Sequence, residues 1–162
     1  RHMLAHETVH AFQTHSPVAS EIDPLVTASI REGFPDYIAW RVTGVVPDTE
    51  RDGWALENQD MLWRRFSEDR AALNAAIEAG TAFAQASDDM QARMRNWHAN
   101  YRAAPEDWPY EMGYWMGRQI VTAYIENASD EAEAIANLLT FEDPLEILEQ
   151  SGFAGLASQT VE

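Results

Sequence analysis

The stretch DPLVTASIREGFPDYIAWRVTG, residues 23–44, decides the fold. It opens with Asp23-Pro24, a helix N-cap followed by a proline at the first helical position. Apolar residues then recur at helical spacing: Leu25, Ile30 and Phe34. Because Pro35 interrupts the backbone hydrogen bonds within this pattern, we expect a kinked or two-piece helix over residues 24–43.

The segments on either side of this stretch are also mostly helical in pattern. Residues 46–53 are polar and rich in turn formers, and they predict an exposed loop. Further helices are expected over residues 2–14, 56–80, 88–101 and 110–127, then one capped at Ser129 or Asp130 and a last one beginning at Asp143-Pro144. Ser67 is a candidate internal cap that would split the helix over 56–80. No sustained period-two alternation indicates a strand.

These patterns predict an all-α fold, a single compact domain of about seven helices. The helix that contains the HExxH pentad, residues 6–10, lies at its N-terminus. We expect this domain to cover residues 1–153 and a loose tail to cover residues 154–162.

The composition limits the classes of function. Eleven Lys+Arg against 27 Asp+Glu give a formal net charge of −16, which would repel phosphate backbones, so we expect no nucleic-acid partner. The absence of cysteine excludes Cys-based zinc fingers, iron–sulfur clusters and thiol nucleophiles. Any metal site must therefore use His and carboxylate. No stretch is apolar and long enough to span a bilayer, so we expect no membrane insertion of this chain.

The pentad His6-Glu7-Thr8-Val9-His10 carries the most chemical information. Residues i and i+4 of a helix project from one face about 6 Å apart along the axis, so the imidazoles of His6 and His10 can reach one metal ion. Glu7 is rotated by about 100° around the axis, which suits it to approach a water on that ion rather than to bind the ion itself. We predict that Glu7 is the general base of a zinc hydrolase.

A catalytic zinc site also needs a third protein ligand and one open position. Glu32 is the candidate, because the helix over residues 24–43 can return antiparallel to the first helix. Asp36 lies four residues later on the same helix face, where it could accept the outer N–H of a zinc-binding histidine and fix its tautomer. The predicted group comprises the metal ligands His6, His10 and Glu32, the base Glu7 and the supporting carboxylate of Asp36.

The order of these motifs resembles that of known zinc peptidases. HETVH followed by EGFPD, residues 32–36, is similar to the gluzincins, the thermolysin-like peptidases with HExxH, a spacer, a glutamate ligand and an aspartate four residues later. More narrowly, the chain resembles the predicted Zn-dependent proteases related to gliding-motility lipoproteins. The segments that match their further motifs are Glu32 to Tyr37, Gly113-Tyr114-Trp115-Met116-Gly117 and Ser151-Gly152.

The resemblance implies a zinc metallopeptidase that hydrolyses peptide or protein substrates. Zn²⁺ would be held by His6, His10 and Glu32, and Glu7 would activate the water. The narrower resemblance also favours an extracytoplasmic, periplasmic location, although the chain as given begins without a signal peptide pattern. We expect an upstream segment to be missing, because the first residues already have the pattern of a helix.

A non-catalytic protein is the main alternative, and a hydrolase of some other amide is a third, because the metal site does not specify what is cleaved. Gluzincins usually place a β-sheet before the HExxH helix, whereas this chain starts at the helix. It could therefore be a helical binding or structural protein whose zinc site is degenerate or only pins two helices together. A fourth protein ligand, for which His2 is the candidate, would favour that structural role.

Hydrolysis further requires a donor that stabilises the developing oxyanion. Tyr114 and Arg118 are the candidates, since they share a helix face on which Gly113 and Gly117 permit close approach to another helix. His98 is a second choice. The competing interpretations are that Tyr114 is a packed aromatic and that Arg118 is one half of an ion pair.

Overall fold

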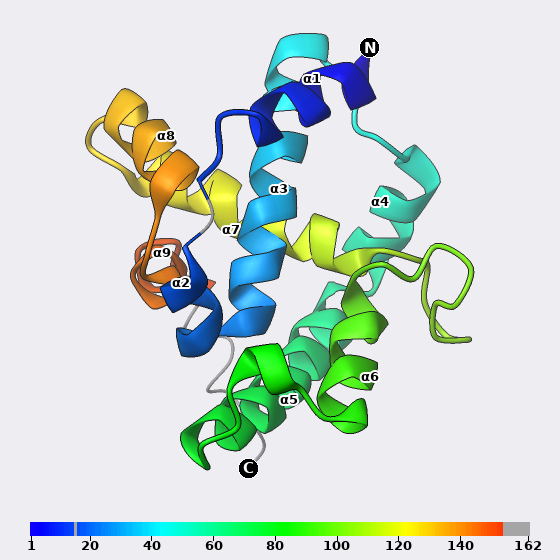
Figure 1. The fold of residues 1–162 in the computed structure, drawn as a ribbon. Coiled ribbons are helices and arrows are strands. Elements are labelled where there is room, and N and C mark those ends of the chain that lie inside the picture. Colours follow the sequence, from blue (N-terminus) through cyan, green and yellow to red (C-terminus); the bar gives the residue numbers. More distant parts are fainter. Residues whose placement is uncertain (15, 154–162) are drawn as a thin grey trace.

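The computed structural model describes residues 1–14 and 16–153, and over these residues it contains helices, turns and loops (Figure 1). The elements are α1 (His2–His10), α2 (Pro17–Ile22), α3 (Pro24–Thr43), α4 (Thr49–Glu57), α5 (Gln59–Glu78), the 3₁₀ turn η1 (Phe83–Gln85), α6 (Asp88–Trp97), α7 (Met112–Asn127), α8 (Glu131–Thr140) and α9 (Pro144–Gln150). The predicted all-α fold is confirmed, with nine α-helices rather than about seven in the described part. The tail predicted over residues 154–162 lies outside it.

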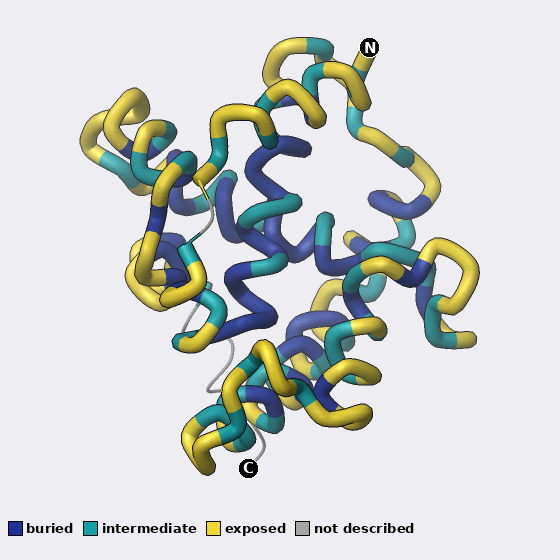
Figure 2. Tube along the Cα trace, viewed as in Figure 1, coloured by how far each residue is buried: buried dark blue, intermediate teal, exposed yellow. Residues whose placement is uncertain are grey.

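Helix α3 is the centre of the fold. Figure 2 shows it buried along most of its length, while α1 and α8 are largely exposed. The Asp23 side chain accepts a hydrogen bond from the Val26 N–H at its start, and Gly44 ends it in the left-handed conformation. Of the two expected forms, a kinked helix or two pieces, the two-piece form is wrong, because one helix continues through Pro35.

Several other boundaries differ from the prediction. Helix α1 ends at His10 rather than at residue 14, α6 ends at Trp97 rather than at residue 101, and the short helix α2 was not expected. The expected loop over residues 46–53 is wrong in its second half, because Asp48 accepts hydrogen bonds from two backbone N–H groups and so starts α4 at Thr49. The segment 56–80 is split at Asn58 instead of at Ser67. The Ser67 hydroxyl donates to the Trp63 carbonyl one turn earlier, so it lies inside α5 and caps nothing.

The packing of α3 against α7 positions the candidate site. The two helices cross at Gly33 and Gly117, where a Cβ atom on either glycine would overlap backbone atoms of the opposite helix. The expectation that Gly117 permits close helix approach is confirmed. This crossing brings the first turns of α7, including Tyr114, next to Glu32 on α3.

Helix α1 lies across the C-terminal half of α3, on the side of α3 that carries Glu32 and Asp36 (Figure 1). The packed interior beneath is built from aromatic and aliphatic side chains, of which Trp97, Trp115 and Phe34 are among the largest. No described helix is both long and apolar enough to cross a membrane.

Candidate metal centre

Three donor atoms from two helices converge beside α1. The Nε2 atoms of His6 and His10 lie 3.0 Å apart. The Oε2 atom of Glu32 lies 3.5 Å from Nε2 of His6 and 3.3 Å from Nε2 of His10. The structure thus brings together the two histidines of the pentad and the glutamate proposed as third ligand.

The other ring nitrogen of His6 fixes its tautomer. Nδ1 of His6 lies 2.8 Å from Oδ1 of Asp36, and an ionised carboxylate can only accept a hydrogen bond. Nδ1 therefore donates, and the lone pair of neutral His6 is on Nε2, which faces His10 and Glu32. Pro35 does not prevent Asp36 from reaching His6, and the contact is the one expected of a supporting carboxylate.

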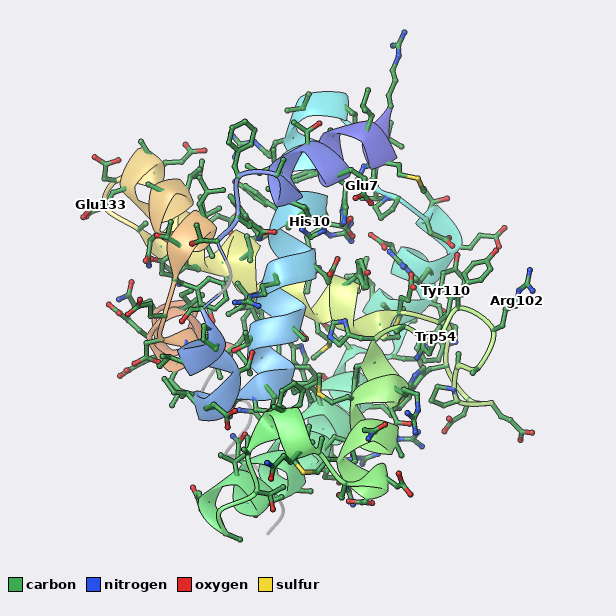
Figure 3. All side chains as sticks on the ribbon, viewed as in Figure 1. Glu7, His10, Trp54, Arg102, Tyr110 and Glu133 are labelled. Carbon is green, nitrogen blue, oxygen red and sulfur yellow. The ribbon has the colours of Figure 1, made fainter. Side chains whose placement is uncertain are left out.

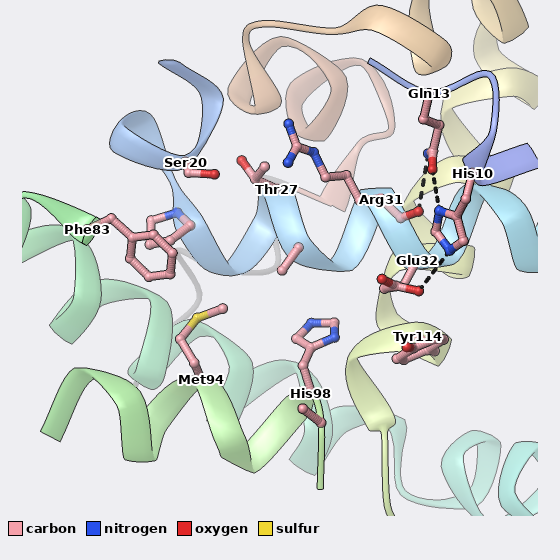
Figure 4. Close-up of a pocket in the computed structure, with 13 residues that line it drawn as sticks. His10, Gln13, Ser20, Thr27, Arg31, Glu32, Phe83, Met94, His98 and Tyr114 are labelled. Atoms are coloured by element: carbon pink, nitrogen blue, oxygen red, sulfur yellow. Dashed lines mark hydrogen bonds and ion pairs between the residues drawn. The ribbon is translucent and has the colours of Figure 1, made fainter. Parts of the chain in front are cut away.

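The tautomer of His10 is set by a residue that sequence reasoning missed. Nδ1 of His10 lies 2.7 Å from Oε1 of Gln13, and the amide nitrogen of Gln13 donates to the Arg31 carbonyl at 3.2 Å (Figure 4). Pro35 lacks the N–H that would otherwise bond the Arg31 carbonyl within α3, so this carbonyl has room for an outside donor. Gln13 must then turn its oxygen to His10, whose Nδ1 donates. The proline and a glutamine three residues after the pentad were the available sequence signals.

This hydrogen bonding leaves three electron-rich atoms facing one point. If both imidazoles are in their neutral forms, the two Nε2 atoms and the Glu32 carboxylate all present lone pairs with no hydrogen between them, which is unfavourable unless a positive charge lies among them. All three donor atoms lie within 4.8 Å of one another. The cluster is therefore built to attract a proton or a cation.

The spacing also fits zinc. Two ligand atoms about 2.05 Å from a tetrahedral zinc ion are about 3.3 Å apart. The three observed separations are 3.0, 3.3 and 3.5 Å. Imidazole nitrogen and carboxylate oxygen are both ordinary zinc ligands. Small movements of the side chains would complete the geometry.

The pKa shifts of His6 and Glu32 also indicate that a positive charge is favourable within the cluster. Burial disfavours a charged His6, but hydrogen bonds and negative charges from Asp36 and Glu32 outweigh it and raise the pKa of His6 to about 9. For Glu32, burial acts to raise the pKa, and interactions with His6, His10 and Tyr114 overcome it and lower the pKa. A proton thus occupies the cluster near neutral pH, in the place where a metal cation would compete with it.

His2 belongs to a neighbouring group of donors. Its Nε2 lies 3.4 Å from Oδ1 of Asp36, and its Nδ1 lies 3.0 Å from the Val45 carbonyl. His2, His6 and Asp36 form a second set of close donors, but the 2.8 Å contact of His6 with Asp36 in that set is explained by a hydrogen bond. Within the described residues, no fourth His, Asp or Glu has a ligand atom within 4.8 Å of all three atoms of the set His6, His10 and Glu32.

Glu7 faces a small cavity beside these donors. It is an exposed residue of α1 (Figure 3). Together with His6, Asp36 and Tyr114 it lines a cavity of about 210 Å³. Glu7 is thus not among the converging donors, as expected from its rotation around the helix, but it lines a cavity that His6 also lines.

Tyr114 belongs to the walls of two cavities. Its ring stacks on that of His6, with the centroids 6.1 Å apart and the planes at 17°. It lines both the small cavity and the larger pocket that contains His10 and Glu32. Burial and the negative charges of Glu32 and Glu111 raise the pKa of Tyr114 far above its ordinary value, so the phenol stays protonated and able to donate.

Arg118 does not enter either cavity. Its guanidinium is buried and pairs with Asp52 of α4, which is the ion-pair interpretation of this residue. The structure therefore does not place Arg118 as an oxyanion donor. Burial acts to raise the pKa of Asp36, but the hydrogen bond and charge of His6, the hydrogen bond of His2 and the charge of Arg118 together lower it.

His98 lies on the far wall of the larger pocket. Its Nε2 is 3.1 Å from the Ser29 hydroxyl, and its ring packs against Gly113 and Tyr114. Burial lowers the pKa of His98 to about 4, so it is neutral near pH 7. It can therefore contribute a neutral hydrogen-bonding group to the pocket.

Comparison with protein families identifies the chain. Residues 48–155, more than half of its length, match the family described as gliding motility protein GldB. The chain belongs to the GldB family. The GldB match supports the narrower of the two resemblances. It includes Tyr114 and Arg118 and begins after the HExxH helix and α3. No curated protein and no solved structure matches the chain.

Proposed function

We propose that this protein is a zinc-dependent peptidase with His6, His10 and Glu32 as metal ligands. The observation that supports it most strongly is the convergence of two Nε2 atoms and one carboxylate oxygen at separations of 3.0 to 3.5 Å, while Asp36 and Gln13 occupy the Nδ1 atoms of the two imidazoles. Three protein donors leave one position for water, as in catalytic rather than closed structural zinc sites.

The roles of the surrounding residues follow from their positions. Bound Zn²⁺ would supply Lewis-acid polarisation of the substrate carbonyl and make water more acidic. Glu7 takes one proton from the attacking water and passes it to the leaving amine as the C–N bond breaks. The Tyr114 hydroxyl donates a hydrogen bond to the developing oxyanion. Asp36 and Gln13 hold the two imidazoles in the tautomers that direct Nε2 at the metal.

Replacement of Glu7 separates the peptidase from the structural alternative. Glu7→Gln removes the base but leaves the three ligands unchanged, so we expect zinc content near one per chain and a loss of peptide hydrolysis of at least about 100-fold. The assay combines metal analysis with hydrolysis of a peptide library read by mass spectrometry. Glu50→Gln, at an exposed position on α4, is the matched control and should retain full activity.

The outcome also tests the competing function, a helical protein in which zinc only joins α1 to α3. Wild-type protein that binds zinc tightly but hydrolyses no peptide would support that structural role. Hydrolysis that survives in Glu7→Gln would remove Glu7 from the mechanism.

We also propose that the protein acts outside the cytoplasm, at the cell envelope. This proposal rests on the GldB family match and its description as a gliding motility protein. Fractionation of cells that express the full-length protein, followed by immunodetection in each fraction, tests it.

A further inference from the structure

A pocket of about 600 Å³ extends from the candidate metal centre along α3 (Figure 4). His10 and Tyr114 lie at one end, and Phe83 and Met94 lie at the other. The α3 wall is a single stripe at helical spacing, formed by Pro24, Thr27, Ala28, Arg31 and Glu32. A peptide bound with its scissile carbonyl at the metal would have this pocket beside it.

The pocket differs in charge from the rest of the chain. The protein has 27 Asp+Glu and only 11 Lys+Arg, yet Glu32 is the one carboxylate among the described residues that line the pocket. Glu32 is already committed to the metal group. Arg31 is the one arginine of the same lining. Apart from the metal centre itself, the fixed charge of the pocket wall is therefore positive.

Arg31 has no anionic partner in the described chain. Its Nη2 donates to the Ser16 carbonyl at 3.1 Å, and its guanidinium carbon lies 6.0 Å from the centre of the Phe141 ring. Its Nε is buried without a hydrogen-bond partner, and no described carboxylate forms an ion pair with it. A guanidinium group keeps its positive charge at neutral pH. A half-buried guanidinium without an acid in so acidic a chain is suited to a carboxylate from outside.

We propose that Arg31 binds a carboxylate of the substrate, so that the pocket selects peptides with an anionic group one or two residues beyond the scissile bond. The side chain of Arg31 runs along α3 toward Thr27 and away from Glu32 (Figure 4). Arg31 and Thr27 are one helical turn apart, which is about 5.4 Å along α3. One extended residue of a bound peptide spans about 3.3–3.6 Å, so one or two residues cover a comparable distance from the scissile bond. A free C-terminal carboxylate or an acidic side chain supplies the same chemistry. This inference rests on the proposed peptidase function.

Binding to a catalytically silent protein tests this selection without requiring turnover. Zinc-loaded Glu7→Gln protein is titrated by calorimetry with acetyl-Ala-Ala-Leu as the free acid and as the C-terminal amide. We expect the acid to bind about tenfold or more tightly than the amide, because a charge-assisted Arg–carboxylate pair replaces a neutral contact. A second pair, acetyl-Ala-Ala-Glu-amide and acetyl-Ala-Ala-Gln-amide, shows whether an acidic side chain gains the same advantage.

Two arginine variants assign the preference to one residue. In the Glu7→Gln background, Arg31→Gln should abolish the difference between acid and amide, and Arg31→Lys should retain part of it. Arg64→Gln removes the same charge from an exposed position and should leave the difference unchanged. Both variants remove the guanidinium that donates to the Ser16 carbonyl, but only Arg31→Lys keeps the positive charge. A preference that remains in Arg31→Lys and is lost in Arg31→Gln therefore depends on the charge and not on the contact with Ser16.

Equal binding of all four peptides, or a carboxylate preference that survives Arg31→Gln, would overturn the inference. These results are independent of peptidase activity. A preference that depends on Arg31, in a protein whose wild type hydrolyses nothing, would support the anion site and refute the peptidase. Hydrolysis of acids and amides at equal rates, with equal binding of both, would support the peptidase and refute the anion site.

Discussion

Gln13 and Pro35 act on the orientation of His10 although neither touches the proposed metal position. Pro35 frees the Arg31 carbonyl, Gln13 donates to that carbonyl, and the oxygen of Gln13 then accepts from Nδ1 of His10. The consequence is that the Nε2 lone pair of His10 is directed at Glu32. A single missing backbone N–H therefore contributes to the proposed site through two hydrogen bonds.

Gln13 tests this arrangement at the scale of one residue. Gln13→Leu removes the acceptor for Nδ1, so the two tautomers of His10 become similar in energy, and we expect zinc affinity to fall about 10–100-fold. Gln13→Glu restores an acceptor and should retain more of the affinity. Competition with a chromophoric chelator measures both. Gln85→Leu, an exposed position, serves as control, and unchanged affinity in Gln13→Leu would show that Gln13 has no part in the site.

Sequence reasoning anticipated part of this group. His6, His10 and Glu32 follow from helical spacing and a plausible return of the chain, and the structure does bring their side chains together. Gln13 could not be predicted, because its position depends on how the chain leaves α1 and which carbonyl of α3 it meets. Arg118 shared a face with Tyr114 as expected, but the position of its partner Asp52 on α4 could not be deduced from spacing along α7.

At the scale of helices, the crossing of α3 and α7 sets the distance between Glu32 and Tyr114. The crossing depends on two positions without side chains, Gly33 and Gly117, at which backbone meets backbone. The helices themselves were predicted from caps and apolar spacing. The start of α4 was not, since Gly53 and the polar residues before it have the composition of a turn although Asp48 caps a helix.

Gly117→Ala tests the crossing. The added methyl group would overlap the Ser29 carbonyl, which cannot move away as a flexible side chain could. We expect the free energy of unfolding to fall by about 3 kcal/mol. Gly53→Ala is the matched control, because it lies in helix α4 with nothing within 4 Å of the added atom, and it should stabilise by about 0.5–1 kcal/mol. Urea denaturation measures both, and equal stability of the two variants would contradict the close crossing.

At the scale of the whole molecule, the proposed site joins two parts of the chain. The proposed ligands lie on α1 and α3, whereas Tyr114 and the ion pair of Arg118 with Asp52 belong to the segment that matches the GldB family. The family match by itself describes the supporting helices and not the ligands. Although the protein has a net charge of −16, Glu32 is the one carboxylate among the described residues that line the pocket beside the site. Because both parts pack around α3, the proposed site requires both of them to be folded.

The location of zinc tests the central claim most directly. In a crystal of the zinc-loaded protein, we predict one anomalous peak at the zinc absorption edge, about 2.0–2.2 Å from Nε2 of His6, Nε2 of His10 and a carboxylate oxygen of Glu32, with water as the remaining ligand. A peak held by other residues, or full occupancy of the protein with metal while Glu32 points away from both imidazoles, would contradict the account.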